Sequence, residues 1–110
     1  MKKIIIFGAT GNVGSYLTRY CTEFFDKDEF EIIAVGKRNT DAFNVYNIKY
    51  ISVDITSSAD FEKLPTDNIH TVMLLAAKIP SYMDEYNPQE YLNVNIFGAF
   101  NVLEYCKKVK

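Results

Sequence analysis

The chain has 110 residues, of which 48% are hydrophobic and 15% aromatic, and this is enough apolar material for the packed core of one domain. Twelve Lys and Arg against fourteen Asp and Glu give a formal net charge of −2. This balance excludes an intrinsically disordered chain and argues against nucleic-acid binding through a broad basic surface.

Four short apolar runs predict strands that are buried on both faces. They cover residues 3–7, 31–35, 49–53 and 71–77. The first run is rich in isoleucine and ends at a glycine, which is typical of a strand in a parallel sheet, whereas the third has the weakest boundaries.

Three segments have the residue pattern of helices. Residues 12–25 place apolar side chains at helical spacing. Residues 57–64 predict a short helix with Ser57 or Ser58 as its N-cap. The last helix begins at Asn87, where Asn, Pro and Glu occupy the N-cap, first and third positions, and it runs to the end of the chain.

The order of these elements predicts one layered α/β unit. Apolar strands separated by helices form a parallel sheet that is covered on both sides. Crossover connections should be right-handed. No internal repeat, low-complexity tract or linker divides the chain, so residues 1–110 are treated as one unit.

A glycine-rich segment, residues 8–14, connects the first predicted strand to the first predicted helix. Gly8 permits a turn with positive φ, Gly11 leaves room for a pyrophosphate, and Gly14 lets the helix pack closely. The N–H groups at the helix start would face the anion. The candidate cofactor contacts here are Gly8, Thr10, Gly11, Asn12, Val13 and Gly14. The alternative is a glycine-rich turn without a ligand, and a P-loop is excluded because no Gly-Lys-Ser/Thr follows.

The glycine spacing, GxxGxxG, resembles that of the extended short-chain dehydrogenases/reductases, the superfamily of nucleotide-sugar epimerases and dehydratases. Three further segments resemble motifs of this family, in the same order. They are Asp54-Ile55, then Leu74-Leu75-Ala76-Ala77-Lys78, then residues 91–103, which resemble NNVxGTxNLL with Asn95 and Gly98 at matching positions. The resemblance implies a Rossmann-type doubly wound parallel sheet, here with four strands in the order 3-2-1-4 and helices on both faces.

The resemblance also implies roles for residues outside the glycine-rich segment. Asp54 and Ile55 would lie at the adenine, and residues 76–78 would border the ribose and the nicotinamide. Asn95, expected to be buried, would make a structural hydrogen bond behind the active site. The alternatives are that Asp54 is a turn or N-cap residue and that Lys78 is a surface lysine.

The residues after the second strand bear on the choice of cofactor. NAD-preferring sites usually carry a carboxylate there for the ribose 2′-OH, whereas this chain has Gly36 followed by Lys37 and Arg38. Two cations would attract a 2′-phosphate, and Arg38 could stack on the adenine. We therefore expect NAD or NADP, with NADP favoured. The alternative is that both cations are solvated and that Asp41 reaches the ribose.

The family's catalytic motif, Tyr-x-x-x-Lys, is absent, because none of the eight tyrosines has a lysine four residues later. We interpret residues 1–110 as the N-terminal portion of an NAD(P)-binding Rossmann domain, truncated before its catalytic segment and inactive alone. The full-length enzyme would be an NAD(P)-dependent epimerase, dehydratase or reductase that transfers hydride to and from a nucleotide sugar. The alternatives are a short non-catalytic NAD(P)-binding or sensing module and a Rossmann-fold interaction domain without ligand.

The last predicted helix is apolar on more than one side, and a single sheet face cannot cover it. We expect a further helix or a second copy of the chain against it, and therefore a possible homo-oligomer. The fourth strand should also have an open edge.

The cysteines and the amino-terminal residues indicate the compartment. Cys21 and Cys106 lie far apart in helical patterns and are expected to be buried free thiols, which fits a cytoplasmic protein. His70 makes no metal-binding spacing with them. The first apolar run stops at Gly8, too early for a signal peptide, and no run is long enough to span a membrane.

Overall fold

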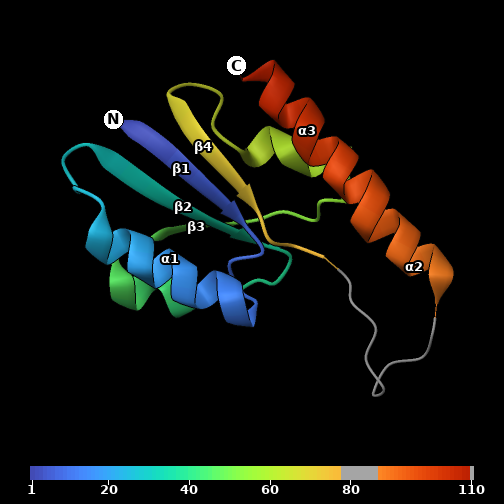
Figure 1. Cartoon of the computed structure of the whole chain (residues 1–110), viewed down its shortest axis with the longest axis horizontal. Helices are drawn as coiled ribbons and strands as arrows, with labels where there is room; N and C mark the ends of the chain where they lie inside the picture. Colours follow the sequence, from blue (N-terminus) through green and yellow to red (C-terminus); the bar gives the residue numbers. More distant parts are fainter. Residues whose placement is uncertain (78–86, 110) are drawn as a thin grey trace.

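The computed structural model describes residues 1–77 and 87–109 (Figure 1). In chain order its elements are β1 (Lys2–Phe7), α1 (Asn12–Phe24), β2 (Phe30–Gly36), the 3₁₀ helix η1 (Ala42–Tyr46), β3 (Lys49–Ser52), the 3₁₀ helix η2 (Ser58–Lys63), β4 (Ile69–Leu74), α2 (Pro88–Leu92), the π-helical segment η3 (Asn93–Gly98) and α3 (Ala99–Lys108). The four predicted strands and the first and last predicted helices are all present, with small differences at their ends.

The described strands form one parallel sheet in the order β3-β2-β1-β4, which confirms the predicted Rossmann-type topology. β1 lies between two partners, so that Ile5 is opposite both Ile33 of β2 and Val72 of β4. Because the strands are parallel, their carboxyl ends meet at one edge of the sheet (Figure 1). Loops that follow the strands are therefore brought together at that edge.

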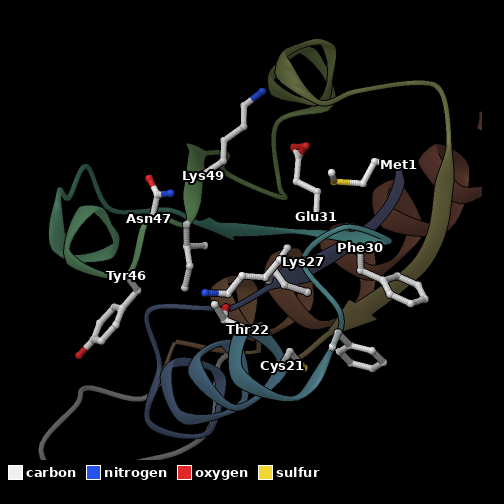
Figure 2. Close-up of a pocket in the computed structure, with 12 residues that line it drawn as sticks. Met1, Cys21, Thr22, Lys27, Phe30, Glu31, Tyr46, Asn47 and Lys49 are labelled. Atoms are coloured by element: carbon white, nitrogen blue, oxygen red, sulfur yellow. The ribbon is translucent and has the colours of Figure 1, made fainter.

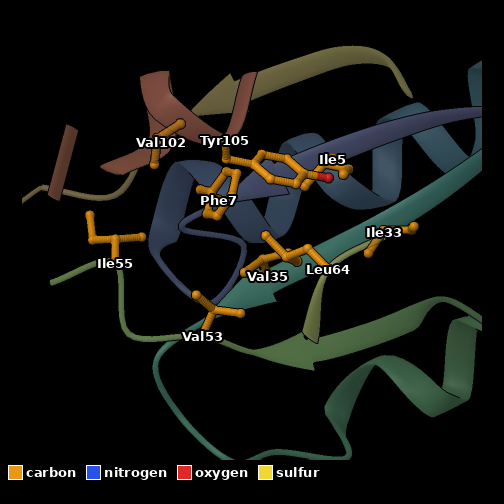
Figure 3. Close-up of a cluster of buried hydrophobic side chains, with 9 residues drawn as sticks. All are labelled: Ile5, Phe7, Ile33, Val35, Val53, Ile55, Leu64, Val102 and Tyr105. Carbon is orange, nitrogen blue, oxygen red and sulfur yellow. The ribbon is translucent and has the colours of Figure 1, made fainter. Parts of the chain in front are cut away.

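Successive residues of β1 point to opposite faces of the sheet and bury two separate cores. Ile5 and Phe7 belong to a core that includes Tyr105 of α3 (Figure 3). Ile4 belongs to the other core, which includes Cys21 of α1. Helices therefore cover both faces of the sheet, as the sequence predicts.

The short helix predicted over residues 57–64 is present as η2, and it is of the 3₁₀ type. A helix of six residues makes too few hydrogen bonds to be stable as an α-helix without strong support from packing. Ser57 is the N-cap but makes no side-chain capping bond. The Asp60 carboxylate accepts instead from the N–H of Asp54, at 2.9 Å.

The fourth strand and η1 differ from the prediction. Residues 71–77 are predicted as a strand, but β4 ends at Leu74, because β1 beside it ends at Phe7. Within the described part of the chain β4 pairs with β1 alone and is an edge strand, as predicted. Its side chains are half-buried or exposed, however, not buried on both faces. The short helix η1 is not predicted at all; it ends at Tyr46 and is followed by its C-cap Asn47, whose φ is +57°.

The last predicted helix begins at Asn87 as expected, and the Asn87 Oδ1 accepts a hydrogen bond from the N–H of Glu90 at 3.3 Å. Helical residues then continue through α2, η3 and α3. Ile96 and Phe100 are more than half exposed, so that apolar surface is left uncovered as predicted. Across residues 1–77 and 87–109, no helix combines the length and apolar character that crossing a bilayer requires.

Both cysteines are free thiols, as predicted. Cys21 is buried, whereas Cys106 is only half-buried, and burial raises the pKa of each thiol.

Candidate functional site

The turn at the end of β1 depends on Gly8. Its φ is +87°, a conformation that residues with a side chain rarely adopt, which confirms the predicted positive φ. A Cβ on Gly8 would also lie 2.6 Å from the backbone nitrogen of Ala76. The N–H groups of Gly8 and Ala9 both donate to the Val35 carbonyl, at 2.9 and 3.0 Å. These bonds fix the turn to the end of β2.

The other two glycines have different surroundings. A Cβ on Gly14 would lie 1.9 Å from the Gly8 carbonyl oxygen, so that α1 packs directly on the turn. A Cβ on Gly11 would meet nothing nearer than that same oxygen, at 3.5 Å. Gly11 has extended backbone, with φ −76° and ψ 174°, which any residue can adopt. The absence of a side chain at Gly11 therefore leaves open space beside the start of α1. The backbone conformation at this position does not itself require a glycine.

The start of α1 presents unused hydrogen-bond donors beside this space. The first bond of the helix runs from Ser15 N–H to the Gly11 carbonyl, at 2.9 Å. The N–H groups of residues 12–14 therefore have no carbonyl partner within the helix. The first turn contains no acidic residue, so the positive end of the helix dipole is not neutralised by the helix itself. Such a helix start favours an anion.

A cavity of about 250 Å³ lies at the carboxyl ends of the strands, between the glycine-rich segment and the ends of β2 and β3. Eight of the predicted site residues line it: Gly8, Thr10, Gly11, Lys37, Asp54, Ile55, Ala76 and Ala77. Six lining residues were not predicted: Phe7, Val35, Gly36, Val53, Leu75 and Val94. Four of these six end a strand or directly follow one, so the carboxyl-end rule for parallel sheets could have found them.

The remaining predicted residues lie outside the cavity lining. Asn12, Val13 and Gly14 form the first turn of α1. What they offer to a ligand is their backbone N–H groups. Arg38 is exposed and its side chain is not part of the lining, and Asp41 is exposed at the start of η1. Lys78 lies outside the described residues.

Asp54 lines the cavity and also stabilises its own turn. Its Oδ1 accepts from the Thr56 hydroxyl at 2.7 Å and from the Thr56 N–H at 3.0 Å. These bonds, the hydroxyl first, hold the pKa of the Asp54 carboxyl below its ordinary value of 3.8. The Oδ2 atom lies 4.0 Å from the Lys37 ammonium. Asp54 therefore has the hydrogen bonds of a turn residue and also lines the cavity, where its lowered pKa favours the charged carboxylate.

Side chains of β3 hold the backbone of residues 36–38 by hydrogen bonds and close packing. The Ser52 hydroxyl donates to the Lys37 carbonyl at 3.0 Å, and the Tyr50 hydroxyl donates to the Arg38 carbonyl at 2.5 Å. A Cβ on Gly36 would lie 2.8 Å from the Tyr50 hydroxyl oxygen. The backbone of this loop is held in place, while the cationic side chains extend into solvent and that of Lys37 is 81% exposed.

The prediction that Asn95 is a buried residue is wrong, because its side chain is exposed. Val94 and Gly98, one helical turn apart, face the sheet at this level, and Asn95 is turned outward from them. The asparagine that the prediction missed is Asn101, whose side-chain amide donates to the Ile55 carbonyl at 2.8 Å. Its spacing of three residues from Gly98 is the signal that could have identified it.

A second cavity, of about 270 Å³, lies at the opposite end of the sheet, between α1 and the starts of β2 and β3 (Figure 2). Its charged side chains do not converge on one point. The Lys27 side chain points in another direction from those of Lys49 and Glu31 (Figure 2). We therefore assign the candidate site to the cavity at the carboxyl ends.

Comparison with known proteins gives consistent results. The model of the NAD dependent epimerase/dehydratase family matches residues 4–110. Sterol-4-alpha-carboxylate 3-dehydrogenase (decarboxylating) of Saccharomyces cerevisiae is 31% identical over 112 residues, which cover 96% of this chain and 31% of that protein. UDP-N-acetylglucosamine 4,6-dehydratase (inverting) of Campylobacter jejuni is 29% identical, covering 96% of this chain and 32% of that protein.

A solved structure, that of L-threonine dehydrogenase from Clostridium difficile, superposes with a TM-score of 0.76 at 30% identity. The match covers 99% of this chain and 34% of that one. The chain therefore spans about a third of the length of the relatives it matches.

Proposed function

The chain belongs to the NAD dependent epimerase/dehydratase family, and from that premise we propose that it binds the dinucleotide cofactor in the cavity at the carboxyl ends of its strands. The observation that carries this proposal is the juxtaposition at Gly11. There an open space, which a side chain would fill, adjoins the free N–H groups at the start of α1. A pyrophosphate fits this chemistry, because it brings negative charge and can approach the backbone closely only where no Cβ intervenes.

The rest of the cavity fits the two halves of a dinucleotide. On one side of the glycine-rich segment, Asp54 and Ile55 offer a charged acceptor and an apolar wall suited to an adenine ring. On the other side, Ala76 and Ala77 offer small side chains where the ribose and nicotinamide would lie. Thr10 lines the cavity between them.

We propose further that NADP is preferred to NAD. Gly36 stands where a carboxylate would accept the ribose 2′-OH, and Lys37 and Arg38 follow it. Their backbone is fixed by Ser52 and Tyr50 while their cationic ends remain exposed, so that both could reach a 2′-phosphate. Because Lys37 already lies near Asp54, its charge is partly offset there, and Arg38 would supply the stronger contact.

The whole enzyme would be a longer protein, of which this chain supplies the cofactor-binding portion. A bound nicotinamide dinucleotide supplies hydride transfer. No tyrosine of this chain is followed by a lysine four residues later, so a general acid or base of the Tyr-x-x-x-Lys type would have to come from further residues. We propose a nucleotide sugar as the substrate, which the Campylobacter jejuni dehydratase supports by its name. The names of the yeast and Clostridium difficile relatives point to a sterol carboxylate and to threonine, so the substrate class requires its own test.

Cofactor binding is tested by thermal unfolding with and without NADP⁺ and NAD⁺. A ligand at ten times its Kd stabilises the folded state by about 1.4 kcal/mol, which raises the Tm of a domain of this size by about 5 °C. Gly11→Asp places a carboxylate at the proposed pyrophosphate position and should abolish the shift. Asn44→Asp adds the same charge at an exposed position of η1 and should leave it intact. A wild-type protein that shows no shift with either cofactor overturns the proposal.

A non-catalytic dinucleotide-binding module is the alternative favoured by the absence of the catalytic motif. It predicts the same cofactor binding, so the reading frame beyond Lys110 distinguishes the two. Continuation into a Tyr-x-x-x-Lys supports the enzyme, and a stop codon directly after Lys110 supports the module.

A further inference from the structure

Two side chains of α3 hold the connection between β3 and β4. The Asn101 amide donates to the Ile55 carbonyl at 2.8 Å, and the Tyr105 hydroxyl donates to the Pro65 carbonyl at 2.6 Å. The two residues are four apart and therefore share one face of the helix. Ile55 lines the candidate cavity, whereas Pro65 does not. The two bonds thus attach opposite ends of the connection, and only one of them is at the site.

Ile55 is held by a second contact from the same helical segment. A Cβ on Gly98 would lie 2.6 Å from the Ile55 Cδ1, so the helix backbone packs directly on this side chain. Gly98 and Asn101 are three residues apart, and together they fix the side chain and the carbonyl of Ile55. Ile55 is 8% exposed, so its carbonyl has little alternative access to water.

The neighbours of Ile55 are fixed as well. Asp54 accepts two bonds from Thr56, and the N–H of Asp54 donates to the Asp60 carboxylate. Residues 54–56 therefore form a small rigid turn, and its anchor on the helix side is the bond from Asn101. Losing that donor would leave the Ile55 carbonyl unsatisfied and free to rotate, together with the peptide planes on either side of it.

We infer that Asn101 is a positioning residue for the adenine half of the dinucleotide, acting through the orientation of residues 54–56. This inference rests on the proposed function of the cavity. Asn101 itself does not line that cavity, so its effect on affinity must pass through Ile55. Tyr105 serves as the control residue, because its hydrogen bond to the Pro65 carbonyl holds the other end of the same connection, away from the cavity.

The experiment compares NAD⁺ affinity and Tm in four proteins: the wild type, Asn101→Leu, Asn101→Asp and Tyr105→Phe. Asn101→Leu removes the donor at nearly constant volume and should raise the Kd by about three- to tenfold, the worth of one neutral hydrogen bond. Tyr105→Phe also removes one hydrogen bond from α3 and should lower the Tm while leaving the Kd unchanged. If Tyr105→Phe weakens binding as much as Asn101→Leu does, the inference is overturned, because general loosening would explain both.

The Asn101→Asp variant adds a second measurement, the pH dependence of the Kd, which a merely structural role of Asn101 would not change. Its ionised carboxylate faces the Ile55 carbonyl and cannot donate, whereas its protonated form can. The Kd of this variant should therefore fall at least about threefold, relative to that of Asn101→Leu, as the pH is lowered from 8 to 4, where an aspartate of ordinary pKa, about 3.9, becomes protonated. Glu62, Glu104 and Lys108, which line the same groove as Asn101, are present in both variants and cancel in the comparison.

A ligand-free measurement separates this inference from the proposed function. Hydrogen exchange at the amides of Asp54 and Thr56 should accelerate in Asn101→Leu, while exchange in β1 stays unchanged. If the wild type binds neither dinucleotide, the proposed function fails, and the role of Asn101 as an anchor is still decided by this exchange. Unchanged exchange, or a Kd equal to that of the wild type in both Asn101 variants, overturns the inference.

Discussion

Gly14 lies directly against Gly8, so that a Cβ on Gly14 would be 1.9 Å from the Gly8 carbonyl oxygen. The obstacle is backbone, and the backbone of Gly8 is itself fixed by its hydrogen bond to the Val35 carbonyl. Neither residue has room to move away. Gly11 stands between them in the sequence, yet a Cβ there would meet nothing closer than 3.5 Å. The three glycines therefore meet different physical requirements.

This difference predicts opposite effects for two alanine substitutions. Gly14→Ala should lower the free energy of unfolding by about 2 kcal/mol or more, because α1 must shift off the turn. Gly11→Ala should leave that free energy within about 0.5 kcal/mol of the wild type, since its backbone suits alanine. It should nevertheless weaken dinucleotide binding, because the methyl group fills the space proposed for the pyrophosphate. Urea unfolding and titration calorimetry measure the two quantities. Equal losses of stability in both variants would contradict the assignment.

The glycine-rich segment and the strand order could be predicted because both follow from local chemistry. A glycine directly after an apolar strand and before a helical pattern leaves few conformations, and a positive φ at Gly8 is one of them. Alternating buried strands and helices restrict the topology in the same way. The cavity lining follows from these two features, which is why eight predicted residues meet in it.

The phase of the last helix could not be predicted from its sequence. Ile96 and Phe97 are apolar yet exposed, so the hydrophobic pattern does not show which face packs on the sheet. The π-helical turn of η3 further displaces residues 93–98 from ideal α-helical spacing. For these two reasons Asn95 was placed in the interior, although Asn101 is the residue that bonds to the β3–β4 connection.

Of the two short helices, η2 was predicted without its 3₁₀ type, and η1 was not predicted. The 3₁₀ helices η1 and η2 depend on turn geometry and on side chains distant in sequence, such as the Asp60 carboxylate at the N–H of Asp54. Hydrophobic periodicity over five or six residues contains no such information.

The hydroxyl of Thr56 should control the ionisation of Asp54. Thr56→Val removes the first cause of the lowered pKa, so the pKa of Asp54 should rise toward its ordinary value of 3.8. A carboxyl whose folded-state pKa is depressed stabilises the protein above its unfolded-state pKa, and this stability is lost as the pH falls through the folded-state value. The variant should therefore be less stable than the wild type at pH 6, and the difference should shrink below pH 4. NMR titration of the Asp54 carboxyl carbon measures the pKa, and an unchanged value would refute the assignment.

The preference for NADP predicts that removing Lys37 or Arg38 weakens the binding of NADP⁺ more than that of NAD⁺. Arg38→Ala should raise the Kd of NADP⁺ about tenfold, and Lys37→Ala should raise it by a smaller factor, because Asp54 partly offsets the Lys37 charge. Neither substitution should raise the Kd of NAD⁺ more than about threefold, because NAD⁺ has no 2′-phosphate. Lys49→Ala removes a lysine at the opposite end of the sheet and serves as the matched control. Wild-type protein that binds NAD⁺ more tightly than NADP⁺ would refute the preference.

Tyr105 predicts a loss of stability at alkaline pH. Burial, and then the neighbouring Cys106 thiolate, raise the pKa of its phenol to about 12, from an ordinary 10. The folded state therefore retains a proton that the unfolded state loses, so this stability is complete below pH 10 and disappears as the pH rises toward 12. A shift of that size corresponds to about 3 kcal/mol. The comparison is between the wild type and Tyr105→Phe, which keeps the ring packed against Phe7 but has no proton to lose.

Below pH 10 the wild type should be the more stable of these two proteins, since its hydroxyl donates to the Pro65 carbonyl at 2.6 Å, a bond worth about 1 kcal/mol. Between pH 10 and 12 this advantage should vanish and then reverse, because the phenolate cannot donate and is costly to bury. The other seven tyrosines are the same in both proteins and cancel in the difference. Urea midpoints measured from pH 8 to 11.5 follow this difference, and a difference that stays constant with pH would show that the phenol does not keep its proton in the folded state.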